Sequence, residues 1–273
     1  MGIVNINDDS FSGDGTLDIE GALAQARQMI ADGADIIDVG AESARTNREA
    51  ISIDEEIRRL RPFLERFPVL VATSHQDSRR ALDTPLVSVN TWRPQVIEAM
   101  LPMGVDLVND ISGLPDPKNA ALCAEHGAAL LIMHTVGLPK IPHTHQRWEN
   151  VLEAMEVFFE EKIALAESAG LELDRIILDP GIDFAKQRED NLAIYRYLDR
   201  FQKFGRPILL PVSRKTVIGE VLGIASPVDR DAGTAACVVR GARLGADIFR
   251  VHNVAAAVQA LETIAPLCVS SET

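Results

Sequence analysis

Polar and charged side chains stand at the ends of short apolar runs throughout this sequence of 273 residues. Two of them, Asp179 and Asn109, could pair with the donor and acceptor edge of a heterocycle, because a carboxylate accepts hydrogen bonds while an amide both donates and accepts them. The whole set comprises Asn5, Asp38, Glu42, Asn90, Asn109, Asp110, His134, Asp179, Ser213, Arg214, Lys215, Arg250 and His252.

Several members of this set near the end of the chain are cations. Lys215, Arg250 and His252, with backbone N–H groups at a helix start, could hold a phosphate or a pyrophosphate. Taken singly, an Asp or Asn after a strand is more often a turn former or a helix cap, and a histidine is as often structural as functional. Turn formation does not explain cations that follow neighbouring strands, so the set as a whole predicts a binding site.

These residues can meet only if the strands that carry them all end on one side of the molecule. Short β-branched runs alternate with amphipathic stretches, and several runs are almost continuous in Ile, Leu and Val, as in parallel strands buried on both faces. Strands are expected at residues 2–6, 35–40, 86–90, 106–111, 129–133, 175–179, 207–212 and 246–251. Helices are expected at residues 17–32, 54–66, 93–103, 117–126, 151–169, 189–204 and 232–244.

Eight strands alternating with helices favour the α/β class and one (β/α)8 TIM barrel, a single domain over residues 1–273. An open dinucleotide-binding sheet is disfavoured, because no GxGxxG follows the first strand. Residues 67–85 fit this rhythm poorly and contain a further strand-like run at 68–72, so we interpret them as an insertion. In a barrel, the carboxyl ends of all strands open on one face, where active sites lie.

The composition is that of an acidic protein with enough hydrophobic residues to form one sizeable core. Hydrophobic residues make up 47% of the chain, and the formal net charge of −13 argues against a nucleic-acid partner. Three cysteines without paired spacing predict reduced thiols, and no apolar run reaches the length of a membrane span, so a cytoplasmic location is expected. His143 and His145 lie in a stretch without a third metal ligand, which favours a solvated loop.

Eight motifs, in order along the whole chain, resemble those of the dihydropteroate synthase family. They are Ile3-Val4-Asn5 with Asp9-Ser10-Phe11-Ser12, Asp38-Val39-Gly40 with Glu42-Ser43 and Arg45, Asn109-Asp110-Ile111-Ser112-Gly113, Met133-His134, Asp179-Pro180-Gly181-Ile182-Asp183-Phe184, Ser213-Arg214-Lys215, Ala232-Gly233-Thr234 and Arg250-Val251-His252. The resemblance implies a transferase of folate biosynthesis that condenses 6-hydroxymethyl-7,8-dihydropterin pyrophosphate with p-aminobenzoate, releasing pyrophosphate. It also implies Mg²⁺, a homodimer and a target for sulfonamides.

The same resemblance implies a role for each matching residue. Lys215, Asp179 and Asn90 would be catalytic, and Asn5 would bind Mg²⁺ on the pyrophosphate. The pterin would contact Asn109, Asp179, Lys215, Asn90 and Met133. Arg45, Arg250 and His252 would hold the phosphates, whereas Phe11, Ser213 and Phe184 would border the p-aminobenzoate pocket.

The sequence departs from the family pattern near the expected chemistry. Asn90 replaces an aspartate of the family's Val-Asp-Thr motif, and an amide cannot supply negative charge to a pterin cation. The other departures are Asn7-Asp8 for Thr-Pro, Ala44 and Thr46 in the second loop, Thr135-Val136-Gly137-Leu138-Pro139 in place of a Gln-Gly-Thr-Pro stretch, and Asn253 for an aspartate.

These departures leave other functions open. One alternative is a pterin-binding paralogue without synthase activity, and another is a methyltetrahydrofolate-dependent methyltransferase. The latter would have no use for the cations Lys215, Arg250 and His252, because its chemistry needs no pyrophosphate site. A third alternative is a barrel enzyme for an unrelated phosphorylated metabolite, which would bind no pterin.

Overall fold

Eight parallel strands form a closed barrel in the computed structural model, which describes residues 1–7, 15–44, 46, 48–73 and 84–267. Strands β1 (Gly2–Asn5), β2 (Ile36–Gly40), β3 (Leu86–Asn90), β4 (Leu107–Asp110), β5 (Ala129–Met133) and β6 (Ile176–Asp179) form one sheet in sequence order. Strands β7 (Leu209–Leu210) and β8 (Ile248–Phe249) form a pair. Parallel bridges from Leu178 to Ile208 and from Gly2 to Val251 close the ring, as expected from the sequence.

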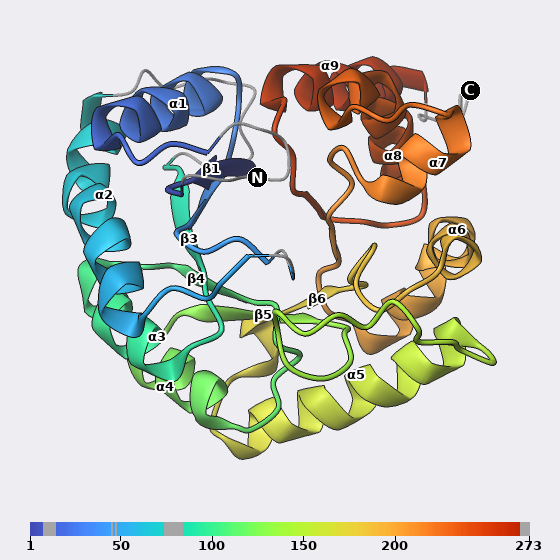
Figure 1. The fold of residues 1–273 in the computed structure, drawn as a ribbon, viewed down its shortest axis with the longest axis horizontal. Helices are drawn as coiled ribbons and strands as arrows, with labels where there is room; N and C mark the ends of the chain where they lie inside the picture. Colours follow the sequence, from blue (N-terminus) through green and yellow to red (C-terminus); the bar gives the residue numbers. More distant parts are fainter. Residues whose placement is uncertain (8–14, 45, 47, 74–83, 268–273) are drawn as a thin grey trace, which may run out of the picture.

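Helices surround the strands, and Figure 1 shows them at the periphery of the ring. Asp18 and Asn150 cap the starts of two of them by accepting backbone hydrogen bonds, and left-handed Gly127 ends a third. The helices are α1 (Ile19–Ala31), α2 (Ile53–Thr73), α3 (Pro94–Met100), α4 (Lys118–His126), α5 (Val151–Ser168), α6 (Arg188–Arg196), α7 (Thr216–Leu222), α8 (Asp231–Arg243) and α9 (Val254–Ile264).

One expectation was wrong, because residues 68–72 are not strand-like. They lie inside α2, which continues to Thr73 despite Pro62 and Pro68. The helix continues because Phe63, Phe67 and Leu70 recur at helical spacing and are all buried. Of the expected insertion, residues 74–83 lie outside the described residues, and β3 takes the expected third place in the barrel.

Strands β7 and β8 are much shorter than the expected residues 207–212 and 246–251. Proline brackets the first of them at Pro207 and Pro211, and it has no N–H to donate to a strand ladder. Residues beyond β7 and β8 therefore run as irregular backbone toward the carboxyl-end face.

Alternate side chains along a strand point into two separate apolar cores. On β5, Leu130 and Ile132 pack outward against the helices, while Leu131 and Met133 point into the barrel with Leu107 of β4. The floor of the barrel is thus apolar, and polar side chains lie above it toward the carboxyl ends of the strands. Within the described part of the chain, no helix combines the length and apolar character needed to cross a bilayer.

Candidate active site

A cavity of about 660 Å³ opens at the carboxyl ends of the strands. Its volume suits a small organic ligand. Each of the eight strands, or the residues directly after it, contributes to the wall. Those contributions are Asn5, Gly40, Asn90, Asn109, Met133, Asp179, Ser213 with Lys215, and Arg250 with His252.

Asp38 is the centre of a buried polar network just below this cavity. Its Oδ1 accepts a hydrogen bond from Ser88 Oγ at 2.6 Å. Its Oδ2 accepts from Asn109 Nδ2 at 3.0 Å and from Arg250 Nε at 2.7 Å. The carboxylate therefore orients two of the cavity residues, and it is fully shielded from solvent itself.

Asp179 and Asn109 offer complementary groups to a ligand. Both are buried, and Asn109 Oδ1 has no hydrogen-bond partner within the described structure. Asp179 Oδ1 accepts from Gly181 N at 2.6 Å. Burial raises the pKa of Asp179 to about 6, although the positive charges of Lys215, Lys186 and Arg250 oppose this shift. An unpartnered buried acceptor costs free energy, so it favours a ligand that supplies a donor.

Lys215 precedes α7 and lies between the Asp179 side of the cavity and the Phe184 ring. Its Nζ donates to the carbonyl oxygen of Ile182 at 2.8 Å and lies 5.1 Å from the centre of the Phe184 ring. Burial lowers the pKa of Lys215, against the attraction of Asp183 and Asp179. Lys215 and Phe184 therefore form one continuous part of the wall.

Arg250, Ser213 and His252 line the same cavity, and the sequence predicts that Arg250 and His252 bind an anion. Ser213 Oγ lies 2.7 Å from His252 Nδ1 and also accepts from the backbone N–H of His252 at 3.1 Å. Ser213 thus fixes the imidazole ring, a contact that sequence reasoning missed. The remaining predicted residues Asn5, Asn90 and Met133 line the cavity, whereas Phe11 and Arg45 lie outside the described residues.

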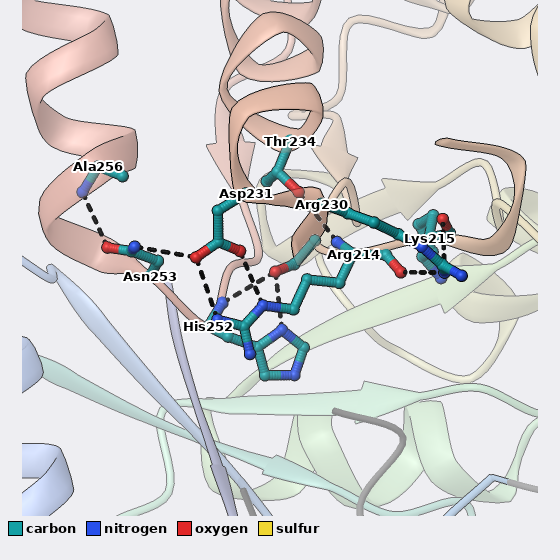
Figure 2. A network of polar contacts seen from close by, with 9 residues as sticks. Arg214, Lys215, Arg230, Asp231, Thr234, His252, Asn253 and Ala256 are labelled. Atoms are coloured by element: carbon teal, nitrogen blue, oxygen red, sulfur yellow. Dashed lines mark hydrogen bonds and ion pairs between the residues drawn. The ribbon is translucent and has the colours of Figure 1, made fainter. Parts of the chain in front are cut away.

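Arg214 turns away from the cavity, although it stands between two cavity residues. Its guanidinium contacts both oxygens of Asp231, at 2.8 and 3.1 Å, and Asn253 Nδ2 donates to the same carboxylate at 3.0 Å (Figure 2). Its backbone N–H donates to Thr234 Oγ1 at 3.0 Å. The expected strand-end cation Arg214 thus joins β7 to α8 and does not line the site.

For His134, the sequence left a structural and a functional role equally open. His134 is buried against Trp148 and Phe158, and burial lowers its pKa to about 2. It is therefore a neutral packing residue and does not line the cavity. His143, expected in a solvated loop, is half-buried on the cavity wall, where the ring lies close to Gly137. Among the described residues, no group of three or more His, Cys, Asp or Glu could hold a metal.

Sequence reasoning missed two lysines that line the cavity. Lys140 adopts a positive φ of 69° and donates to the carbonyl oxygens of Ser43 at 3.0 Å and Glu49 at 3.4 Å. It thereby ties the loop after β5 to the loop after β2. Lys186 lies in the loop after β6 and is only 8% exposed. The sequence signal that could have identified Lys186 as a site residue is its position two residues after Phe184, the last residue of the Asp179–Phe184 motif.

A buried ionic cluster braces the loop after β2. Arg93 Nη2 lies 2.7 Å from Glu42 Oε2, and Arg93 Nη1 lies 2.5 Å from Glu56 Oε2. Burial raises the pKa of Glu56, while the Thr91 hydroxyl and Arg93 oppose the shift. The cluster connects the β2 loop, the first turn of α2 and the β3 loop at the rim of the cavity.

Comparisons with known proteins agree with this arrangement. A family model described as pterin binding enzyme matches residues 1–252. The dihydropteroate synthase of Bacillus subtilis is 40% identical over 256 residues, covering 93% of this chain and 83% of the relative. Two structures of the Xanthomonas albilineans dihydropteroate synthase each cover 98% of this chain and 93% of their own. The one with 4-aminobenzoic acid has a TM-score of 0.84 at 35% identity, and the one with 7,8-dihydropteroate has 0.83 at 34%.

Proposed function

The chain belongs to the dihydropteroate synthase family of pterin-binding enzymes, and from this premise we propose which residues of its cavity carry the reaction. The protein is a transferase of folate biosynthesis. The proposed reaction joins 6-hydroxymethyl-7,8-dihydropterin pyrophosphate to p-aminobenzoate. The observation that carries the proposal is the buried pair of Asp179 and Asn109 in a cavity that also contains Lys215 and Arg250.

The pterin would lie with its 2-amino-4-oxopyrimidine edge against the buried polar residues. Ionised Asp179 accepts hydrogen bonds from the amino group and the ring N–H, and Asn109 Oδ1 accepts a further one. Lys215 would contact the ring from the Phe184 side, and Met133 would pack against its face. Asn90 would stand beside the reacting carbon.

The pyrophosphate would lie toward Arg250 and His252. Arg250 gives one N–H to Asp38 and has further donors for phosphate oxygens, and Ser213 orients His252. Mg²⁺ fits this end, because it is commonly bound by one or two protein oxygens together with substrate phosphates, and Asn5 supplies an amide oxygen. When bound, Mg²⁺ would neutralise charge on the leaving pyrophosphate. Arg45 is proposed to assist there.

The second substrate would enter beside Phe184 and Ser213, with Phe11 closing over it. A relative has been solved with 4-aminobenzoic acid, which supports this choice of substrate. In the reaction the carbon–oxygen bond to pyrophosphate breaks, and the carbon–nitrogen bond to the arylamine forms. The amine then loses a proton. The cations at the anion end stabilise the departing charge, which is their contribution to rate.

Release of pyrophosphate from purified protein tests this proposal. The reaction would contain 6-hydroxymethyl-7,8-dihydropterin pyrophosphate, Mg²⁺ and p-aminobenzoate, with Asp179→Ala and omission of p-aminobenzoate as controls. We expect release that requires p-aminobenzoate and disappears in the variant. Pterin binding without turnover would instead identify a pterin-binding paralogue, and absence of binding would reject a pterin substrate.

We also infer that the chain works in the cytoplasm as one catalytic domain and as a homodimer. Exposed apolar side chains support pairing: Val221 and Leu222 at the end of α7, and Val228 in the short 3-10 helix Pro227–Arg230. Light scattering at several protein concentrations tests the dimer. A mass of one chain at all concentrations would reject it.

A further inference from the structure

The ammonium group of Lys186 is enclosed by backbone carbonyl oxygens. Its Nζ donates to His134 O at 3.1 Å, to Gly181 O at 3.0 Å and to Phe184 O at 3.0 Å. A protonated lysine has three N–H donors, so these contacts use all of them. The group therefore joins the end of β5 to the loop after β6, at the cavity that Lys186 lines.

The loop that Lys186 holds has an uncommon backbone. Gly181, Asp183 and Ala185 all have positive φ, of 64°, 68° and 51°. At Gly181 a Cβ would lie 2.1 Å from His134 O, so only glycine fits. Non-glycine residues in this region cost free energy and persist where surrounding contacts over-determine them. The alternating geometry turns successive carbonyl groups to different sides, toward Lys186 from Gly181 and toward Lys215 from Ile182.

The loop has a second anchor that carries no charge. Asn191 on α6 accepts from Asp183 N at 2.9 Å and donates to Asp183 Oδ1 at 3.2 Å. Asp183 in turn accepts from Thr216 N at 2.6 Å, at the start of α7. The loop is thus held by a cation on one side and by an amide on the other, and the two can be removed separately.

The turn held by Lys186 also orients Asp179. The Gly181 backbone N–H donates to Asp179 Oδ1, while the Gly181 carbonyl accepts from Lys186. Positive charges facing Asp179 come from Lys186 in the same loop, from Lys215 before α7 and from Arg250 after β8. Burial lowers the pKa of Lys186 to about 7, and the charge of Lys215 adds to this shift, whereas Asp179, Asp190 and Asp183 oppose it. Lys186 is therefore fully charged only below pH 7, the range in which Asp179 titrates.

We propose that Lys186 is a positioning residue for the pterin, which fixes the 181–184 turn behind Asp179 and supplies buried positive charge that keeps the Asp179 carboxylate ionised. The proposal rests on the proposed pterin pocket, in which Asp179 must accept hydrogen bonds from the ring edge. Lys186 acts through Asp179, since all three of its donors are occupied by the chain itself.

The direction of the pH effect follows from the charges. Burial raises the pKa of Asp179 to about 6, and the positive charge of Lys186 counteracts that shift. Removing the charge raises the pKa of Asp179 further, so a larger fraction of the carboxyl is protonated near neutral pH. A protonated carboxyl loses part of its capacity to accept hydrogen bonds, and pterin affinity then falls at a pH where the wild type still binds.

The test is calorimetric titration with 6-hydroxymethylpterin, which carries the ring edge without pyrophosphate, between pH 5 and pH 8. We expect Lys186→Met to move the acid limb of the affinity profile upward by about one unit, as loss of a neighbouring opposite charge does, so that binding weakens about tenfold near pH 5 and about twofold near pH 7. Lys186→Gln, which keeps N–H donors without charge, should show the same upward shift with a smaller loss of affinity at pH 8.

Two controls separate charge from loop structure. Asn191→Ala loosens the same loop from its uncharged side, and we expect weaker binding at every pH with the acid limb unmoved. Lys118→Met removes one exposed lysine charge from the start of α4 and should bind like the wild type. Thermal unfolding checks that each variant folds.

An acid limb that stays in place in both Lys186 variants would overturn the charge role. An equal shift in Asn191→Ala would do the same. If neither Lys186 variant folds, Lys186 belongs to the stability of the barrel and the positioning role is also wrong. Failure of the wild type to bind the pterin would count against the proposed function instead, which separates the two outcomes.

Discussion

Asp38 on β2 and Arg250 after β8 are 212 residues apart in the chain, yet the Arg250 Nε donates to Asp38 Oδ2 at 2.7 Å beneath the cavity. The same oxygen accepts from Asn109. One fully buried carboxylate thus fixes a residue of the proposed anion end and a residue of the proposed pterin edge relative to each other. This relationship predicts that stability and binding respond together when the carboxylate is changed.

Asp38→Asn should destabilise the protein and weaken pyrophosphate binding. The amide would present N–H groups to Arg250 or to Ser88, and breaking one partner of a buried pair costs about 3–5 kcal/mol. Urea unfolding measures the loss of stability, and competition of pyrophosphate with the pterin pyrophosphate measures the loss of pyrophosphate binding. The exposed substitution Asp174→Asn is the control. Strictly additive losses in the double variant Asp38→Asn with Arg250→Met would show that the pair is not coupled.

Asp179→Asn should separate binding from stability. The pKa of Asp179 rises from 3.8 to about 6 in the folded protein, so the folded state binds a proton more tightly than the unfolded state in that interval. Its contribution to the free energy of unfolding therefore falls as the pH rises through that interval, while pterin affinity increases. We expect Asp179→Asn to raise the melting temperature at pH 7.5 and to weaken pterin binding by about 1.5–3 kcal/mol. An unchanged or lower melting temperature would contradict the buried-charge interpretation.

Arg93→Met should be strongly destabilising and should disturb the loop after β2. It would leave the buried carboxylates of Glu42 and Glu56 without their shared cation, at a cost of about 3–5 kcal/mol. Arg58→Met is the matched control, because Arg58 is 72% exposed in its pair with Glu55 and such pairs contribute about 0–1 kcal/mol. Chemical unfolding of both variants compares the costs, and similar values would argue against a bracing role for the cluster.

Asn90→Asp should increase turnover with little change in pterin affinity. Asn90 lines the cavity at the end of β3, where the family pattern has an aspartate. A carboxylate there would stabilise a developing pterin cation, and one well-placed stabilising group is commonly worth about 10²–10³-fold in rate. Steady-state pyrophosphate release and pterin calorimetry check both parts. A turnover that falls would mean that this chain has adapted to the amide.

Much of the fold and of the proposed site was predictable from local pattern. Asn109, Asp179 and Arg250 stand at or directly after strands, and parallel strands in a barrel must bring those ends to one face. Periodicity did not resolve the second half of α2, where the run at residues 68–72 was interpreted as strand-like. The helix continues because its buried face packs on the barrel, which is a tertiary contact.

By itself the sequence determined the barrel, the face on which the site lies and the set of residues at the strand ends, since these follow from side-chain period and strand polarity. Only the tertiary structure decided what the loop residues do. Arg214 pairs with Asp231, and Lys186 donates a hydrogen bond to the carbonyl oxygen of His134, which lies 52 residues earlier in the chain. The physical reason is that every residue has a backbone carbonyl group, so the sequence does not indicate which carbonyl groups will accept hydrogen bonds from a given lysine. That depends on loop geometry, which forms only when distant segments pack.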